Sequence, residues 1–172
     1  MFNQFYHNQY HMSTSLQKPF LNFLYTAHLK TYAGTDLDRK KTKCIKSKIL
    51  GHQEYYYKEK EWEYFDSYSG HIFPPGKEVV FYKKQPFWTM SYQGQYINNK
   101  KVTAKEVYTF LREALRDNNK NNPFRGPKKY NNDNWQYIFK MKGNWKYFIG
   151  REEVFYKNKL VFFQDIIGSI IK

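Results

Sequence analysis

The sequence predicts an α+β fold in which an antiparallel sheet has helices packed on one side. Two segments carry apolar residues at helical spacing, and each is followed by segments in which apolar and polar residues alternate. The order helix, strand, strand, strand, with room for a fourth strand, therefore occurs twice. The 172 residues suit one domain with a substantial core. We expect a tail at 1–14 and a single domain at 15–172, made of tandem copies at 15–98 and 99–172.

An amphipathic helix is predicted at the start of each copy. The first copy presents one helix face through Phe20, Phe23, Leu24, Ala27 and His28. The second copy repeats this spacing at Val107, Phe110, Leu111, Ala114 and Leu115. Thr103 and Glu106 form a T-x-x-E capping box before the second helix, and Gly34 is suited to end the first. We expect His28 to be a core histidine, because it lies on the apolar face.

The strands that follow the helices match between the copies. The segment WEYFDSYSG (62–70) aligns with WQYIFKMKG (135–143) at an offset of 73 residues. The segment GKEVVFYKK (76–84) aligns with GREEVFYKN (150–158) at an offset of 74 residues. Alternation within these segments predicts half-buried strands, and the short breaks between them predict hairpins. We interpret the chain as an internal duplication whose copies meet about a pseudo-twofold axis.

The chain is basic, with a net charge of +14. Such a charge attracts nucleic acids and other polyanions, although lysine-rich codon usage in an AT-rich genome gives the same composition. Basic residues gather in the connection at 34–53, where a solvated lysine loop is the alternative interpretation. The candidate nucleic-acid-binding residues are Arg39, Lys40, Lys41, Lys43, Lys46 and Lys48. The Asn-rich segment 118–134 is predicted to be a plain connection.

Asp66 interrupts an otherwise aromatic strand face, and the second copy has Phe139 at its position. A buried carboxylate is costly without a partner. A tyrosine hydroxyl, a backbone turn or a lysine would satisfy it. Alternatively, it anchors a pocket for a cationic or planar ligand. The candidate ligand-binding residues are Trp62, Tyr64, Asp66, Tyr68, Glu78, Tyr82, Trp88, Met90 and Tyr92.

Glu78 and Glu152 occupy the same position in the two copies. A glutamate there in both copies favours a structural role, and we expect hydrogen bonds to backbone N–H groups of the preceding turns at Gly76 and Gly150. The alternative is catalytic. Together with Asp66, the two glutamates form the candidate acid–base set of a hydrolase or transferase.

No catalytic or cofactor-binding motif is evident in the sequence. There is no G-x-S-x-G elbow, no P-loop and no dinucleotide-binding glycine motif. His7 and His11 are four residues apart but lie in a Tyr- and Asn-rich tail, so we expect no metal site. Cys44 lies among lysines, which would lower the pKa of its thiol, yet it has no evident histidine partner. We expect no cofactor and a non-enzymatic role.

The composition also predicts the compartment. The first residues lack the basic and apolar regions of a secretory signal. No apolar run approaches the ~20 residues of a membrane span, and a single cysteine cannot form an internal disulfide. We expect a soluble, cytoplasmic protein with no membrane partner.

Several sequence blocks match a known pattern. They are TYAG (31–34), EYFDSYSG (63–70), GKEVVFYK (76–83), PFWTMSYQG (86–94), FRGP (124–127) and FIGRE (148–152). Through them the chain resembles the domain of unknown function 5680 family, from about Phe20 to Ile171. Such domains often follow an Xre-type helix-turn-helix in bacterial regulators. The resemblance therefore implies a bacterial or phage-borne cytoplasmic protein and a sensor or interaction domain.

The chain departs from the family pattern in three places. We expect no helix-turn-helix ahead of the domain, so DNA binding is not carried over from the family. The first F-x-G-x-E motif is stretched to FPPGKE (73–78), and the last strand lacks the expected aromatic residue and double glycine.

The sequence favours a non-enzymatic, sensor-type module that binds a small molecule or a protein partner in an aromatic pocket anchored by a carboxylate. The alternative is a basic accessory protein that binds nucleic acid through Arg39–Lys48. The two hypotheses differ in their salt dependence, because phosphate contacts weaken steeply with salt.

Overall fold

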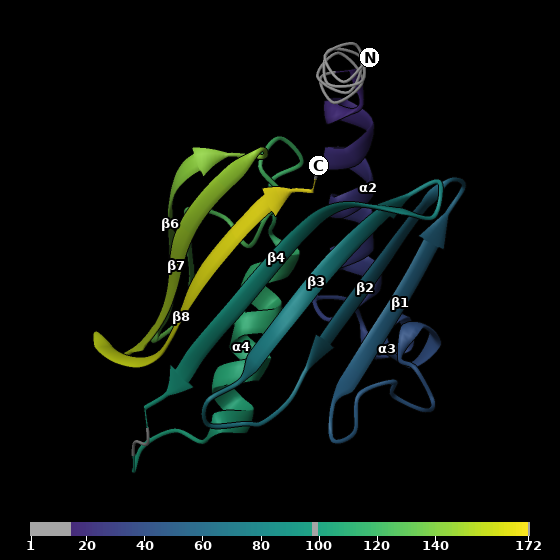
Figure 1. Cartoon of the computed structure of the whole chain (residues 1–172). Helices are drawn as coiled ribbons and strands as arrows, with labels where there is room; N and C mark the ends of the chain where they lie inside the picture. The colour runs from purple at the N-terminus through teal and green to yellow at the C-terminus, as the bar shows by residue number, and fades with distance from the viewer. Residues whose placement is uncertain (1–14, 98–99, 172) are drawn as a thin grey trace.

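The computed structural model describes residues 15–97 and 100–171. These residues form three helices and an eight-stranded antiparallel sheet, which confirms the predicted α+β class (Figure 1). The helices are α2 (Gln17–Lys30), α3 (Asp36–Thr42) and α4 (Ala104–Arg116). The strands are β1 (Gln53–Glu59), β2 (Trp62–Tyr68), β3 (Pro75–Tyr82), β4 (Gln85–Tyr96), β5 (Lys129–Asn132), β6 (Trp135–Asn144), β7 (Tyr147–Tyr156) and β8 (Lys159–Ile170). None of the described helices is long and apolar enough to cross a membrane.

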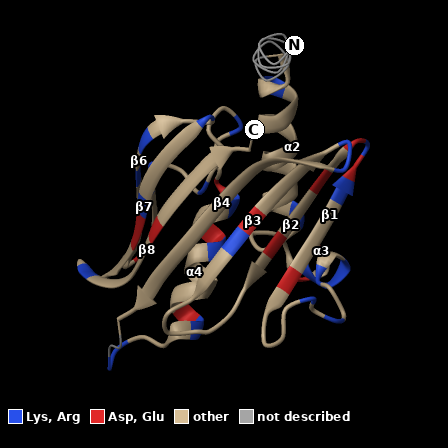
Figure 2. Ribbon diagram, viewed as in Figure 1, with Lys and Arg blue, Asp and Glu red and all other residues tan. Residues whose placement is uncertain are grey.

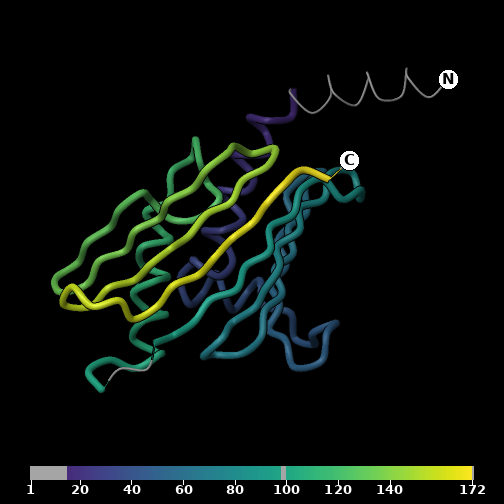
Figure 3. Tube along the Cα trace, turned by 60° about the vertical axis from the view of Figure 1, so that its left-hand side comes forward, coloured from purple at the N-terminus to yellow at the C-terminus, as the bar shows by residue number. Residues whose placement is uncertain are grey.

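The two halves of the sheet meet where β4 pairs with β8. The strand order is β1-β2-β3-β4-β8-β7-β6-β5, so each half is a run of hairpins. The register of the central pair runs from Trp88 opposite Ile170 to Tyr96 opposite Phe162. Figure 3 shows that the sheet is curved around the helices, with the outer strands of the two halves on opposite sides of them. Strands far apart in the sequence therefore form one continuous surface.

Helix α4 follows its prediction closely. The Thr103 hydroxyl accepts a hydrogen bond from the backbone N–H of Glu106, and the Glu106 carboxylate accepts one from the backbone N–H of Thr103. The apolar stripes of α4 and α2 are both buried, and His28 lies in the core as predicted. Helix α2 ends earlier than predicted, at Lys30 with Thr31 as its C-cap, and the backbone N–H of Gly34 donates to the Thr31 carbonyl.

A short helix, α3, lies in the basic connection that the sequence predicts to be a loop. The Thr35 hydroxyl accepts from the backbone N–H of Asp38, and the Asp38 carboxylate accepts from the backbone N–H of Thr35. This is a capping box like that of α4. None of the residues of α3 is buried. A search for apolar periodicity therefore misses the helix.

Two-residue turns close the hairpins β3–β4 and β7–β8. Lys83 and Lys84 have φ values of 50° and 65°, and Lys157 and Asn158 have φ values of 47° and 63°. Positive φ at both central residues is the mark of a type I′ turn, whose twist matches that of the flanking strands. The predicted hairpins are therefore present, with the same turn in each half.

The core lies between the sheet and the helices α2 and α4. The Phe20 ring of α2 contacts Trp62 and Trp88, with ring centroids 6.1 and 5.5 Å apart. Trp88 also stacks on Phe124 and Phe148, which belong to the second half of the chain. Both halves therefore share one hydrophobic core.

Candidate functional site

Arg125 joins the two halves through a buried ionic cluster. Its Nε and Nη2 atoms donate to Oε2 and Oε1 of Glu152 on β7 at 3.1 and 2.7 Å. Its Nη1 atom lies 3.7 Å from Oε1 of Glu78 on β3. The other oxygen of Glu78 lies 2.7 Å from Nε2 of His28 on α2. All four side chains are buried, and the planar guanidinium suits this bidentate arrangement.

The two glutamates thus pair with side chains, rather than with the backbone N–H groups of the turns at Gly76 and Gly150 that the sequence suggests. Glu152 also accepts hydrogen bonds from the Tyr137 hydroxyl and the Gln164 amide, both at 3.0 Å. A buried carboxylate with this many donors is well satisfied. The expectation failed because the cation is Arg125, which lies in the connection between α4 and β5. Only tertiary packing decides where its side chain points.

Asp66 lies beside this cluster. Strand β2 places it directly opposite Glu78, and it is 2% exposed. The Tyr92 hydroxyl on β4 donates to its Oδ1 at 2.8 Å. Burial and then the charge of Glu78 raise the pKa of Asp66 from 3.8 to about 8, against the lowering effects of the Tyr92 hydrogen bond and the Arg125 charge. The Asp66 carboxyl is therefore neutral at pH 7 and has a proton to donate.

A cavity of about 310 Å³ opens beside Asp66. Residues of β1, β2, β4, β8 and α4 contribute to its wall. Five tyrosines line it, namely Tyr32, Tyr55, Tyr68, Tyr92 and Tyr108. Three guanidinium groups also line it, those of Arg39, Arg112 and Arg125. The cavity thus combines aromatic walls with a basic character.

The structure brings together only part of the predicted pocket. Asp66, Tyr68 and Tyr92 line the cavity. Glu78 lies next to it, on a smaller cavity of about 20 Å³ that His28 also lines. The other candidates belong to the hydrophobic core or its margin, because the helices cover that part of the strand face: Trp62, Tyr64, Tyr82, Trp88 and Met90.

The sequence gives little warning of the remaining cavity residues. Tyr55 and Tyr108 are two of 17 tyrosines, so nothing singles them out, whereas Tyr32 lies in the block TYAG. A signal did exist for Arg125. Two glutamates on apolar strand faces require a buried cation, and Arg125 lies in the block FRGP, whose neighbouring Phe124 is buried.

The basic segment divides between the cavity and the surface. Arg39 lines the cavity, donates to the Gly34 carbonyl and pairs with Asp36. The Nζ atom of Lys43 donates to the side-chain oxygen of Gln53 at 3.1 Å. Exposed side chains make up the rest of the segment, at Lys40, Lys41, Lys46 and Lys48. Figure 2 shows lysine and arginine on the helices and on both halves of the sheet as well.

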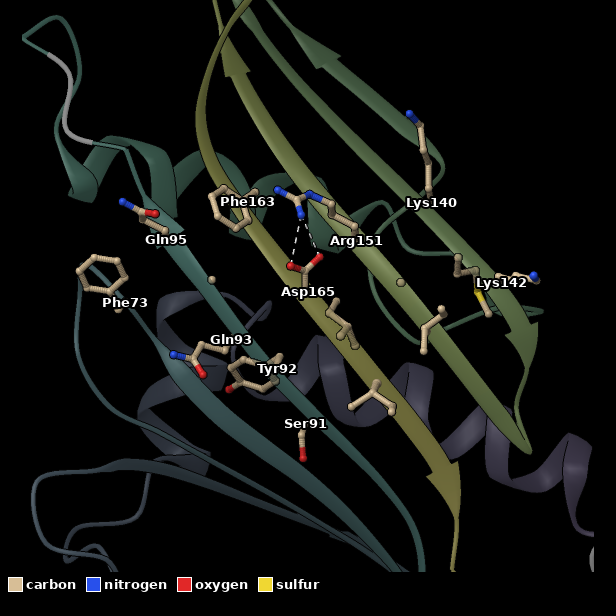
Figure 4. Close-up of a pocket in the computed structure, with 16 residues that line it drawn as sticks. Phe73, Ser91, Tyr92, Gln93, Gln95, Lys140, Lys142, Arg151, Phe163 and Asp165 are labelled. Atoms are coloured by element: carbon tan, nitrogen blue, oxygen red, sulfur yellow. Dashed lines mark hydrogen bonds and ion pairs between the residues drawn. The ribbon is translucent and has the colours of Figure 1, made fainter.

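A wider depression, of about 1010 Å³, lies on the sheet face that no described helix covers (Figure 4). Two of its charged residues pair with each other, since Arg151 donates to both oxygens of Asp165 at 3.2 Å, and Lys140 and Lys142 add exposed positive charge. Arg151 also lies 4.2 Å from the ring centroid of Phe163. Ile149 and Ile167 are about half exposed there. None of the polar side chains that line the depression is buried, so it has no equivalent of Asp66.

Residues 15–97 and 100–171 contain no group of three or more His, Cys, Asp or Glu side chains that suits a metal ion. His7 and His11 lie outside the described residues. The pKa of the Cys44 thiol is raised, first by burial and then by the charge of Glu54. The charge of Lys48 does lower this pKa, as expected, but burial and Glu54 outweigh it, so the thiol is not activated.

No curated protein and no solved structure matches this chain. The model of a family described as a domain of unknown function (DUF5680) matches residues 66–171. The matched part begins at Asp66 and takes in β3, β4, α4 and all four strands of the second half. Because the match covers more than half of the 172 residues, the chain belongs to the DUF5680 family of domains of unknown function.

Proposed function

We propose that the protein is a non-enzymatic, sensor-type module that binds a small ligand in the cavity beside Asp66. The observation that carries this proposal is a buried carboxyl at the wall of a cavity of about 310 Å³. Ligand sites are typically concavities of roughly 300–1,000 Å³ with few polar groups that fix orientation. Most internal voids are far smaller, because protein interiors are close-packed.

The fold itself has no evident need for Asp66. Strand β6 places Phe139 opposite Glu152, where β2 places Asp66 opposite Glu78. Phe139 is buried, and its ring lies against Gly150. An aromatic residue thus serves this position when packing alone is required. A carboxyl group is smaller than a phenyl ring, so it leaves space at this position, and burying it costs free energy because it is polar. We infer that a ligand in this space accounts for the presence of Asp66.

This comparison rests on the interpretation of the chain as a tandem duplication, which the pairing of β4 with β8 supports. Tyr92 lies opposite Ile166, which is 74 residues later and thus its counterpart. A twofold axis through this pair would exchange the strand order β1-β2-β3-β4 with β5-β6-β7-β8. Differences between equivalent positions then indicate a task that only one half performs.

Binding suits the carboxylates better than acid–base catalysis does. Glu152 is held by Arg125, and Glu78 lies against both Arg125 and His28. Neither glutamate is therefore available to exchange protons with a molecule in the cavity. Asp66 alone would have to serve as both acid and base, whereas hydrolytic sites commonly divide these tasks between two groups.

A cavity-filling variant tests the proposal. Asp66→Phe introduces the residue type that β6 uses at the equivalent position, so the fold is expected to persist while the cavity closes. Wild type and variant would be screened by thermal shift against small organic acids, amines and neutral aromatics. At least one compound should raise the Tm of the wild type, because a ligand that binds only the folded state stabilises it. The same compound should leave the Tm of Asp66→Phe unchanged.

Circular dichroism first establishes that the variant is folded, and Asp66→Leu replaces it if it is not. A compound that stabilises the wild type and the filled variant equally would place the binding site elsewhere. A screen without any stabilising compound would also contradict the proposal.

A further inference from the structure

We propose that the ligand is a small planar organic acid whose carboxylate binds Arg112. This inference rests on the proposed function and names the chemical class that the cavity recognises. Three features of the cavity support it: the charges on its wall, the burial of Asp66 and the arrangement of the tyrosine rings.

Two of the three guanidinium groups at the cavity are already paired. Arg125 makes a bidentate contact with Glu152 and lies 3.7 Å from Glu78. Arg39 pairs with Asp36. Their charges are thus offset by carboxylates of the protein, and neither guanidinium requires an anion from outside.

Arg112 differs from the other two. Its Nη2 atom donates to the Thr109 hydroxyl at 3.1 Å, and its guanidinium carbon lies 5.8 Å from the ring centroid of Tyr32. Among the described residues, no Asp or Glu side chain forms an ion pair with it. Arg112 is therefore a planar donor group with an unpaired charge at a cavity wall, and such a group binds a carboxylate through two parallel hydrogen bonds.

Asp66 does not oppose an anionic ligand. It is the single acidic residue among the described residues that line the cavity, and its burial keeps it protonated at neutral pH. A neutral carboxyl both donates and accepts hydrogen bonds, so it suits a hydroxyl or carbonyl group on the ligand. The expectation of a cationic ligand changes accordingly, because the wall has an unpaired positive charge and no negative one to attract a cation.

The tyrosine rings favour a planar ligand body. The rings of Tyr55 and Tyr68 stack with centroids 6.3 Å apart, and Tyr32 meets Tyr68 edge to face at 5.7 Å. Leu111 and Phe162 add apolar surface. Aromatic surfaces of this kind pack well against a ring, so a ring that carries a carboxylate matches the cavity in both shape and charge.

Four probes that share a phenyl ring test the assignment in the full-length chain: benzoate, phenyl phosphate, benzyl alcohol and benzylamine. Isothermal titration calorimetry should find that benzoate binds the wild type more tightly than the other three. Arg112→Gln should weaken benzoate binding by about tenfold or more, because it removes a charge-assisted pair. Arg116→Gln is the matched control, since Arg116 is exposed on the same helix, and it should bind benzoate as the wild type does.

The outcomes separate this inference from the proposed function. If benzyl alcohol or benzylamine binds as tightly as benzoate, or if Arg112→Gln binds benzoate unchanged, the acid assignment is wrong while the cavity remains a binding site. If phenyl phosphate binds more tightly than benzoate, the ligand carries a phosphate group and the carboxylate assignment is wrong. An equal loss in Arg112→Gln and Arg116→Gln would attribute binding to the general positive charge of the chain and overturn the inference. If no probe binds and the Asp66→Phe screen also finds no ligand, the proposed function itself fails.

Discussion

Asp66 and Glu78 lie opposite each other on β2 and β3, and both carboxyls are buried. Two ionised carboxylates on directly opposite residues of a low-dielectric interior would repel each other, and the charge of Glu78 accordingly helps to raise the pKa of Asp66. Glu78 has His28 and Arg125 as partners. Asp66 has the Tyr92 hydroxyl and is the neutral member of the pair. The arrangement places a proton donor at the cavity wall, next to the ionic cluster.

Asp66 should make the protein less stable as the pH rises from about 4 to about 8. The native state keeps the Asp66 proton up to a pKa of about 8, whereas the unfolded chain releases it near 3.8. Between these values the native state binds more protons, so the free energy of unfolding decreases with pH. This contribution is fully present below the unfolded pKa and is lost as the pH passes the folded one. Urea denaturation at several pH values measures it.

Asp66→Asn provides the comparison for this prediction, because it stays neutral while all other groups still titrate. The variant should gain stability relative to the wild type as the pH rises. A difference that stays constant with pH, or that changes in the opposite direction, would mean that Asp66 is ionised in the native protein at neutral pH.

Removing the Arg125 guanidinium is expected to lower the free energy of unfolding by about 3–5 kcal/mol. Arg125→Met leaves Glu152 and Glu78 buried without their shared cation. Arg151→Met is the matched control, since Arg151 pairs with Asp165 at the surface, where an ion pair contributes about 1 kcal/mol or less. Urea denaturation compares the two variants, and similar losses would show that the cluster has no special role in stability.

Gly76 leaves room for the Tyr92 ring. A Cβ atom at residue 76 would lie 2.2 Å from Cζ of Tyr92, so Gly76→Ala must displace this ring from Asp66. Gly150→Ala is the matched control, because its Cβ atom would press on the Phe139 ring, at 2.8 Å. We expect both variants to lose about 1–3 kcal/mol of stability through overpacking. Only Gly76→Ala should also weaken benzoate binding in calorimetry. If the two variants bind benzoate with equal affinity, the Tyr92–Asp66 hydrogen bond does not contribute to binding.

Much of the fold is predictable because its signals are local. The apolar stripe of α4, the Thr103–Glu106 capping box and the strand alternation each depend on residues a few positions apart. Helix α3 is missed because it has a cap but no buried face. The pairing of β4 with β8 brings Trp88 opposite Ile170, and no local pattern specifies a contact between residues so far apart.

The site is only partly predictable for the same physical reason. Asp66 is conspicuous in the sequence because the interpretation of the chain as a duplication aligns it with Phe139. Arg112 and Arg125 are two of 29 basic residues, and charged residues on helices and connections are mostly exposed. The direction in which the Arg112 and Arg125 side chains point depends on how α4 and the connection after it pack against the sheet. The proposal of an anionic ligand therefore rests on the tertiary structure and not on the sequence.

Neutralising exposed lysines of the basic segment separates the two functional hypotheses. Lys40→Gln, Lys41→Gln and Lys46→Gln in one variant should leave the benzoate affinity within about twofold, because exposed charges outside the cavity are screened by salt. If the segment binds nucleic acid, fluorescence anisotropy should show weaker DNA binding by this variant. Its salt slope should also fall by about 1 for each lost phosphate contact. A large loss of benzoate affinity would contradict binding in the cavity.

A crystal structure of the full chain with saturating benzoate is the most direct test of the central claim that the cavity beside Asp66 binds a small organic acid through Arg112. We predict density for the ring among the tyrosines, with a carboxylate oxygen about 2.7–3.2 Å from the Arg112 guanidinium. Benzoate on the opposite face of the sheet near Arg151, or a cavity that contains only water under these conditions, would contradict the claim.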